Sequence, residues 1–213
     1  MVLGEPGTGW RTQRSCAGAF RATDTAPALV LAAGASRRFG GAKALAQWRG
    51  QLLLDHAIGQ ARQLSPDVRV ITGCRGPLLP LRAQRHPTSW LFTPQWRQGM
   101  SASLKLGIHT LPPRARGVFV VLVDQPLIDS ESLCRLRDAA RQEPELPFAA
   151  DYHGRPGVPA YLPRWLWPAL MTLEGDRGAG QILKAAGAHR LAIDGVAADV
   201  DTPEDLANLR RSM

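Results

Sequence analysis

The chain has 213 residues, of which 45% are hydrophobic, and this is enough for one domain with a sizeable core. Its formal net charge of +8 comes from 26 basic residues that are scattered and form no run of five or six. Scattered charge fits a small anionic ligand as well as a nucleic acid, and we expect no nucleic-acid partner. No stretch approaches the roughly 18 consecutive apolar residues of a membrane helix, and the N-terminus lacks the apolar core of a signal peptide. We therefore expect a cytoplasmic protein without a membrane partner.

The three cysteines give no indication of a metal site. Cys16, Cys74 and Cys134 are far apart, form no C-x-x-C pair and have no histidine nearby at the spacing of a zinc site. Their odd number also argues against a disulfide framework, so we expect reduced thiols.

The first half of the chain shows the alternation of strands and helices that is typical of βαβ units. Residues 1–26 are rich in Gly, Thr, Arg and Ser without periodicity, so we interpret them as a flexible extension that precedes a domain of residues 27–213. Asp129 or Ser130 is expected to cap a helix. The predicted strands are 28–33, 68–72, 90–93 and 118–123, and the predicted helices are 54–64, 101–110 and 130–142.

The second half is less regular. Two apolar runs, 148–152 and 158–162, flank a predicted turn at residues 154–157, which indicates a hairpin or an excursion that covers an acceptor substrate. The remaining predicted elements are helices at 163–171 and 177–186, a strand at 190–193, and a final helix with Thr202 as its cap and Pro203 at its first position. Together these elements predict a three-layer α/β/α domain with a mostly parallel sheet, whose ligand binds beyond the carboxyl ends of the strands.

A glycine-rich loop, residues 34–43, leaves the first predicted strand and carries Arg37, Arg38 and Lys43. Glycines let backbone N–H groups approach an anion closely, and the cations neutralise the charge of a departing pyrophosphate. The loop is neither a P-loop, because Ala42 precedes the lysine and Ala44 follows it, nor a G-x-G-x-x-G dinucleotide loop. Glycine content alone leaves an ordinary strand-to-helix turn as an equal alternative.

Two acidic motifs are candidate metal sites. Asp124 ends the most apolar strand, where a carboxylate could hold a Mg²⁺ ion that bridges phosphates; the alternative is a turn-forming Asp before proline. Asp199 and Asp201 alternate with Val200, so in an extended segment both face one side, and either could be the second metal ligand. The alternative here is helix capping, which explains Asp205 well and Asp199 poorly.

A serine-containing segment, residues 99–103, precedes a predicted helix. It is not a nucleophile elbow, because it lacks the closing glycine and no strand immediately precedes it. Ser101 and Ser103 fit helix capping, and at the ligand edge of the sheet they could also hydrogen-bond a base or a sugar.

In their order along the chain, these motifs resemble those of the MobA-like NTP transferases, and within them the molybdenum cofactor cytidylyltransferases. The family motif L-A-A-G-x-S-x-R-[MF]-G-x-x-K is matched by residues 31–43, G-M-S-x-S-L by 99–104, D-Q-P by 124–126, G-D-x-G-A by 175–179 and D-x-D-T-P-E-D-L by 199–206. One such motif is weak, but five in sequence are specific.

The resemblance implies a Rossmann-like nucleotidyltransferase fold with a mostly parallel mixed sheet, and the transfer of CMP from CTP to a molybdopterin-type cofactor with release of pyrophosphate. By motif, Arg38 and Lys43 would bind the triphosphate, and Asp124 and Asp201 the magnesium ion. The nucleotide would also contact Leu31, Ala32, Ala33, Gly34, Ser101 and Ser103.

The sequence departs from the family pattern at three positions. Phe39 replaces the commoner Met, Thr93 stands where Asn is usual before Pro-x-Trp, and Val158 replaces the His of a G-h-P motif in the expected acceptor segment. Ala33, where guanylyltransferases typically have Gly, favours CTP over GTP. The alternatives are transfer with GTP or to another phosphorylated acceptor, such as a sugar or polyol phosphate, and a non-catalytic accessory protein that delivers the cofactor to a molybdenum hydroxylase.

Overall fold

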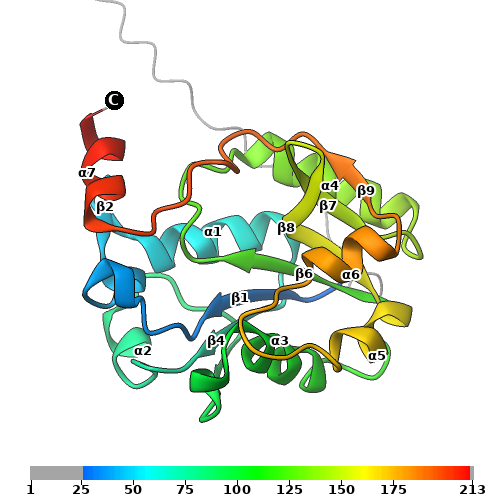
Figure 1. Cartoon of the computed structure of the whole chain (residues 1–213), viewed down its shortest axis with the longest axis horizontal. Coiled ribbons are helices and arrows are strands. Elements are labelled where there is room, and N and C mark those ends of the chain that lie inside the picture. Colours follow the sequence, from blue (N-terminus) through cyan, green and yellow to red (C-terminus); the bar gives the residue numbers. More distant parts are fainter. Residues whose placement is uncertain (1–25, 212–213) are drawn as a thin grey trace, which may run out of the picture.

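The computed structural model describes residues 26–211 and contains one large mixed sheet (Figure 1). The predicted extension, residues 1–26, therefore lies outside the described residues except for Ala26. The strands of this sheet are β1 (Ala28–Ala32), β4 (Val68–Thr72), β5 (Ser89–Phe92), β6 (Gly117–Leu122), β7 (Phe148–Tyr152), β8 (Arg155–Pro163) and β9 (His189–Leu191). Their order is β5-β4-β1-β6-β8-β7-β9, and β8 runs antiparallel to both of its neighbours. The predicted mostly parallel mixed sheet is confirmed.

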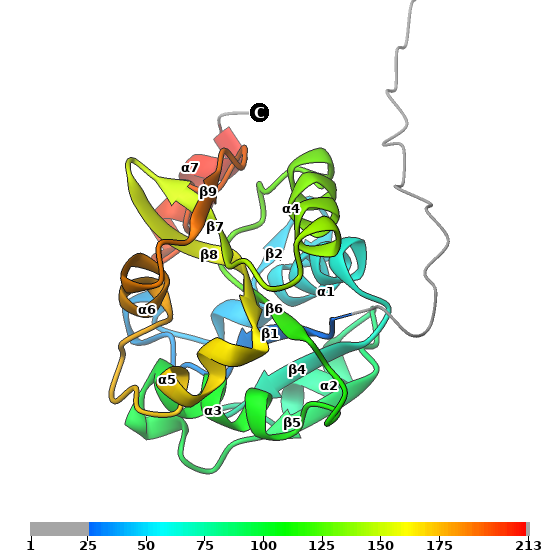
Figure 2. The same ribbon diagram turned by 90° about the vertical axis from the view of Figure 1, so that its right-hand side faces the viewer.

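Helices cover both faces of this sheet, which gives the predicted three layers (Figures 1 and 2). One face carries α1 (Leu53–Leu64) and α4 (Ser130–Gln142), and the other carries α3 (Met100–His109), α5 (Trp167–Leu170) and α6 (Gly180–Ala185). The remaining elements are α2 (Leu78–Arg82), α7 (Pro203–Arg211), the hairpin of β2 (Gln47–Trp48) and β3 (Gln51–Leu52), and the 3-10 turns η1 (Arg37–Phe39), η2 (Lys43–Leu45), η3 (Trp96–Gln98) and η4 (Arg164–Leu166).

The central strand β1 divides the core between the two faces. Successive side chains of a strand point to opposite sides, so Val30 packs against the helices on one face while Leu29 and Leu31 pack against those on the other. All five residues of β1 are buried. Because both faces are covered, the strand is apolar throughout, which is the pattern that made it predictable.

Several sequence predictions need correction in the second half. The turn of the β7–β8 hairpin is at His153 and Gly154, whose φ angles are 51° and 87°, so the predicted turn at 154–157 is wrong and β8 already begins at Arg155. The predicted helix at 163–171 is divided into η4 and α5, and α6 begins at Gly180 rather than at residue 177. By contrast, β4 and α4 have the predicted bounds.

Two expectations from composition can be compared with the structure. Cys74 is free and exposed, whereas Cys134 is disulfide-bonded, so the expectation of reduced thiols is wrong at that position. Within residues 26–211, no helix has the length and apolar character that crossing a membrane requires.

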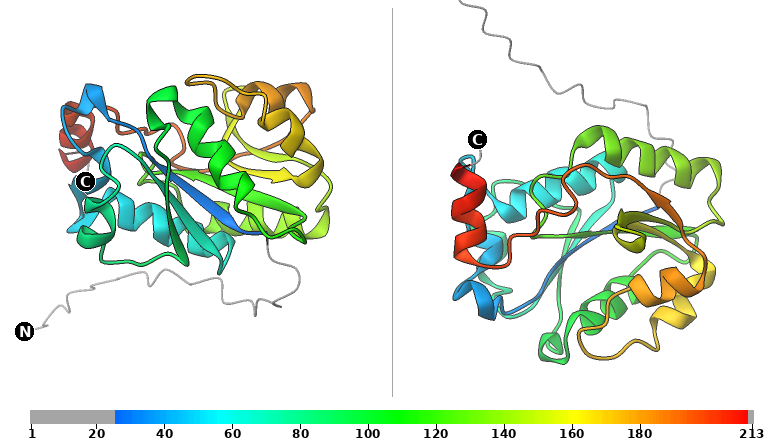
Figure 3. Two further views of the ribbon diagram at one scale, coloured as in Figure 1. Left: turned by 90° about the horizontal axis from the view of Figure 1, so that it is seen from below. Right: turned by 45° about the horizontal axis from the view of Figure 1, so that its top comes forward.

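The last helix returns to the beginning of the fold. In Figures 1 and 3, α7 lies beside the segment that follows β1, although the two are far apart in sequence. A hydrogen bond joins them, from the Arg210 guanidinium to the backbone oxygen of Gln47. This return brings the residues before α7 to the carboxyl ends of β1 and β6.

Candidate functional site

A cavity of about 590 Å³ opens at the carboxyl ends of the parallel strands. This is the edge at which α/β sheets bind ligands. The cavity brings together nine of the ten predicted site residues. Those that line it are Leu31, Ala32, Ala33, Gly34, Arg38, Lys43, Ser103, Asp124 and Asp201.

Ser101 is the predicted site residue that does not line the cavity. Its side chain is buried, and its backbone N–H donates a hydrogen bond to the Gly175 oxygen at 3.1 Å. The structure therefore places Ser103 on the cavity wall, and Ser101 in the contact between the start of α3 and the loop that contains Gly175.

The cationic loop, residues 34–43, leaves room in front of its backbone. A Cβ atom built on Gly34 or Gly41 would meet no atom within 4 Å. Gly40 differs, because its φ of +71° favours glycine by itself. Contacts within the chain therefore do not require glycine at positions 34 and 41. Gly34 also lies on the cavity wall. A glycine in such a place is expected where a ligand approaches the backbone closely.

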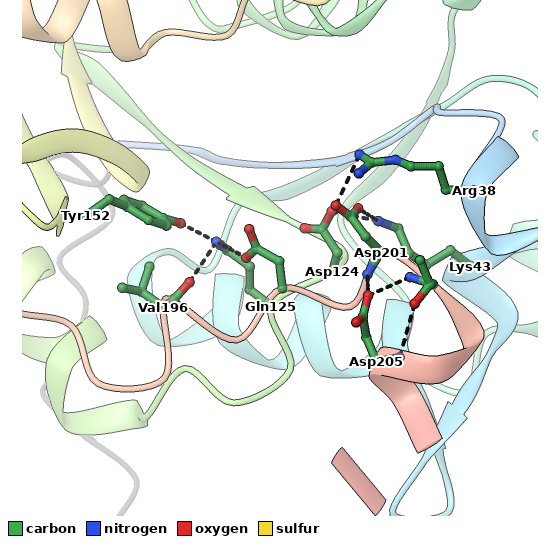
Figure 4. A network of polar contacts seen from close by, with 10 residues as sticks. Arg38, Lys43, Asp124, Gln125, Tyr152, Val196, Asp201 and Asp205 are labelled. Atoms are coloured by element: carbon green, nitrogen blue, oxygen red, sulfur yellow. Dashed lines mark hydrogen bonds and ion pairs between the residues drawn. The ribbon is translucent and has the colours of Figure 1, made fainter. Parts of the chain in front are cut away.

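Lys43 lies between the two acidic segments (Figure 4). Its ammonium nitrogen is 2.8 Å from Asp124 Oδ2 and 3.1 Å from Asp201 Oδ1, and the residue is only 8% exposed. Arg38 contacts Asp201 at 3.1 Å, but its side chain is 76% exposed. Solvent screens such an exposed pair, so the contact holds Arg38 weakly and leaves it able to reorient toward a ligand.

Asp201 is held from its backbone side by the start of α7. The N–H groups of Asp201 and Thr202 donate to Asp205 Oδ2 at 2.9 and 2.8 Å, and the Asp205 N–H donates to Thr202 Oγ1 at 3.1 Å. These reciprocal bonds confirm the predicted capping box. The backbone hydrogen bond from Thr202, together with the bonds from its side chain and from Asp201, lowers the pKa of the Asp205 carboxyl.

Asp199 has a different partner from Asp201. Its Oδ1 accepts a hydrogen bond at 3.0 Å from Nε2 of Gln125, a buried residue that sequence reasoning did not select. Partial burial raises the pKa of the Asp199 carboxyl, the bond from Gln125 opposes this shift, and the nearby Asp124 and Asp201 add to it. The signal that could have identified Gln125 is its position directly after Asp124.

The carboxylates on the cavity wall fit a divalent cation. Asp124 Oδ1 is buried and has no hydrogen-bond partner, although a carboxylate oxygen in that position normally has one. Among residues 26–211 no group of three or more His, Cys, Asp or Glu side chains could hold a metal ion. A cation at Asp124 and Asp201 would therefore take its remaining oxygen ligands from water or from a bound molecule, as Mg²⁺ takes them from water and phosphates.

The sequence model of the MobA-like NTP transferase domain matches residues 28–191. The chain belongs to this family. The MobA-like domain thus includes the cationic loop and Asp124, while Asp199 and Asp201 follow the matched region. The activity class that comes with the family is nucleotidyl transfer.

Curated relatives cover most of the MobA-like chain at low identity. It is 28% identical over 207 residues to the purine catabolism protein PucB of Bacillus subtilis, which covers 87% of this chain and 96% of the relative. It is 29% identical over 191 residues to the molybdenum cofactor guanylyltransferase of Pseudomonas fluorescens, with coverage of 84% and 91%. It is 23% identical over 180 residues to the molybdenum cofactor cytidylyltransferase of Escherichia coli, with coverage of 83% and 91%.

A solved structure has the same fold as the MobA-like chain. The Rv0371c protein of Mycobacterium tuberculosis, in a complex with manganese, superposes with a TM-score of 0.75 at 25% identity, covering 89% of this chain and 100% of the other. The names of two of these relatives indicate nucleotidyl transfer, one with a guanine and one with a cytosine nucleotide, whereas the names of PucB and Rv0371c state no reaction.

Proposed function

We propose that this MobA-like chain transfers CMP from CTP to a molybdopterin-type cofactor and releases pyrophosphate. The observation that carries the proposal is the position of Lys43, whose ammonium group bridges Asp124 and Asp201 on the wall of the cavity. A cation on a glycine-rich loop and two carboxylates opposite it are the groups that a triphosphate and its metal ion need.

The nucleotide contacts divide between backbone and side chains. Ala33 and Gly34 present backbone to the base and ribose, and Ser103 offers a hydroxyl from α3. Lys43 and the exposed Arg38 bind the triphosphate, where their charges stabilise the negative charge that accumulates on the departing pyrophosphate. Ala33, the residue that favours CTP over GTP, supports the choice of nucleotide.

Asp124 and Asp201 hold the magnesium ion in this proposal. When bound, the ion neutralises phosphate charge, as in other phosphoryl-transfer sites. The name of the manganese complex supports a divalent cation in a structure of this fold. The unpartnered, buried Asp124 Oδ1 supports a ligand role for this carboxylate.

The reaction needs no covalent enzyme intermediate. An oxygen of the acceptor phosphate attacks the α-phosphorus of CTP in line, the bond from that phosphorus to the oxygen bridging to the β-phosphate breaks, and pyrophosphate leaves with the electron pair. Lys43 and Arg38 supply positive charge where the negative charge develops. The protein contributes by holding two anions together in the reactive orientation and by stabilising the spreading charge.

The test supplies purified chain and Mg²⁺ with molybdopterin cofactor and with CTP, GTP or ATP separately, and measures pyrophosphate release and the nucleotide in the product. We expect a cytosine dinucleotide product and a kcat/KM for CTP at least about tenfold above that for GTP. A guanine dinucleotide product would show that the nucleotide substrate is GTP and not CTP. Binding of cofactor without pyrophosphate release from any nucleotide would identify a delivery protein instead.

A further inference from the structure

The segment that contains Asp124 and the segment that contains Asp201 run side by side. The Val200 N–H donates a hydrogen bond to the backbone oxygen of Asp124 at 2.8 Å. This bond holds the two chain segments together, but it leaves the carboxylate of each segment free to turn about its own side-chain torsions. The residues that follow Asp124 and precede Asp201 decide how firmly the pair is held.

Gln125 is the centre of the contacts behind the carboxylate pair (Figure 4). It is 1% exposed, and its backbone oxygen accepts a hydrogen bond at 2.7 Å from Nε2 of Gln60 on α1. Its own Nε2 donates to Asp199 Oδ1 at 3.0 Å, to the Val196 oxygen at 3.5 Å and to the Tyr152 hydroxyl. One buried amide therefore connects the end of β6, the segment before α7 and strand β7.

Tyr152 fixes the orientation of this amide from the other side. The Tyr152 hydroxyl accepts from Gln125 and donates to the Val158 oxygen at 2.6 Å, so its donor and acceptor roles are both assigned. Burial raises the pKa of Tyr152 to about 12, and the hydroxyl stays a donor at neutral pH. The amide nitrogen of Gln125 thus points toward Asp199 and cannot exchange places with its oxygen without losing these bonds.

We propose that Gln125 and Asp199 are positioning residues, which hold the segments of Asp124 and Asp201 at the spacing that the metal ion requires. Asp199 acts through its hydrogen bond from Gln125 and is not itself a metal ligand. This inference rests on the proposed function in one respect, that Asp124 and Asp201 bind the ion. Hydrogen-bonded partners that orient metal ligands change metal affinity when they are removed.

The contrast between the two aspartates supports this division of roles. Asp201 lines the cavity and contacts Lys43 and Arg38, whereas Asp199 does not line the cavity. Asp199 is exposed, so a substitution there removes one hydrogen bond without opening a hole in the core. This makes position 199 suitable for a matched pair of variants.

The experiment titrates the full-length chain with Mn²⁺, in the absence of nucleotide and acceptor, and measures the free ion by electron paramagnetic resonance. Asp199→Asn and Asp199→Ala lose the same charge, but only Asn retains an oxygen that accepts from Gln125. We expect the Kd for Mn²⁺ of Asp199→Ala to exceed that of Asp199→Asn by about tenfold. Equal Kd values for the two variants would overturn the inference.

A second variant keeps the test decisive if Asp199→Ala does not fold. Gln125→Met removes the amide but leaves the Asp199 charge in place. We expect its Kd for Mn²⁺ to be about tenfold higher than that of the wild type. In the double variant, Asp199→Ala should add little to Gln125→Met, because both substitutions remove the same hydrogen bond. Wild-type affinity in Gln125→Met, or full additivity of the two losses, would contradict the inference.

The metal readout separates this inference from the assignment of the reaction. A wild-type chain that binds Mn²⁺ and shows the Asn and Ala difference, but transfers no CMP, would support the positioning roles and reject the proposed substrates. If instead the chain transfers CMP but the two position-199 variants bind Mn²⁺ equally, the proposed substrates are supported and the positioning roles are rejected. No Mn²⁺ binding by the wild type would reject both the metal site and the positioning roles.

Discussion

The two walls of the cavity are built in opposite ways. The cationic loop, residues 34–43, buries its last residue, Lys43, against the carboxylates, but its Arg38 side chain is exposed and weakly paired, and a Cβ atom at Gly34 or Gly41 would meet only open space. The acidic segment, residues 199–205, is held by hydrogen bonds to Asp124, to Gln125 and within its own capping box. One wall can adapt to a ligand, and the other presents carboxylates at fixed positions.

This difference suits a site in which an anion and a cation must be bound together. A divalent ion tolerates little displacement of its carboxylate ligands, so the wall that carries these carboxylates must be held rigidly. A triphosphate has many rotatable bonds, and a loop with open backbone can close around it. Substitutions on the two walls should therefore have different effects on stability and on nucleotide binding.

The largest effect is expected where the two walls meet. Lys43→Ala removes the ammonium group that contacts both Asp124 and Asp201, and Asp124→Asn removes one of the two carboxylates. We expect each change to reduce pyrophosphate release by about 10³-fold or more, because a positioned charge at the reacting phosphates is lost. Circular dichroism should show a folded protein. Wild-type turnover in both variants would reject the mechanism.

A large loss of stability, without any change of charge, is expected from Gly99→Ala. Gly99 has a φ of +96°, and a Cβ atom there would lie 2.4 Å from the carbonyl carbon of Gly175, too close to accommodate without moving backbone. Strain and overpacking together should lower the free energy of unfolding by about 2–4 kcal/mol. Urea denaturation measures this loss. An unchanged midpoint would show that the loop of Gly175 moves aside without cost.

Gly34→Ala is the matched change on the adaptable wall. Its Cβ would meet no protein atom within 4 Å, so we expect an unchanged urea midpoint. Because Gly34 lines the cavity and no protein atom surrounds this position, the added methyl group should nevertheless reduce the room for the proposed nucleotide. We expect KM for the nucleotide to rise about tenfold, a cost of about 1.4 kcal/mol. Unchanged kinetics would indicate that the nucleotide does not approach residue 34.

The sequence predicted the first half of the fold well because its signals are local. An apolar run between breakers marked β4, and Asp129 followed by an amphipathic stretch marked α4. The β2–β3 hairpin was not predicted, since its strands have only two residues each. Its turn also places Arg49 at a φ of 49°, and arginine seldom adopts a positive φ. The β7–β8 turn was misplaced for a related reason, because His153 rather than a second glycine adopts positive φ.

The site shows the same limit at the level of side chains. The motifs named the cavity residues, but the alternation of Asp199 and Asp201 predicted equivalent carboxylates on one side of an extended segment. Residues 199–201 are not part of a strand, and the two carboxylates contact different partners, Gln125 and Lys43. Those partners lie 74 and 158 positions away in the sequence, so no local pattern could separate the two roles.

The smallest effect is expected at a residue that does not line the cavity, at the start of α4. Asp129 Oδ1 accepts hydrogen bonds from the N–H groups of Glu131 and Ser132, and Asp129→Ala should lower the free energy of unfolding by about 1 kcal/mol at pH 7 without changing turnover. Burial acts to raise the pKa of Asp129, but the hydrogen bonds from Ser132 and Glu131 and the charge of Arg135 outweigh it and lower the pKa below its ordinary value of 3.8.

A lowered pKa in the folded state means that the ionised cap stabilises the fold above the unfolded-state pKa. The difference in stability between wild type and Asp129→Ala should therefore be constant near neutral pH and shrink as the pH falls through the folded-state pKa. Urea titrations of both proteins across the acid range measure it. If the difference in stability between the two proteins is independent of pH, the ionised carboxylate does not cap α4. The stabilising contribution of Asp129 would then come from packing alone.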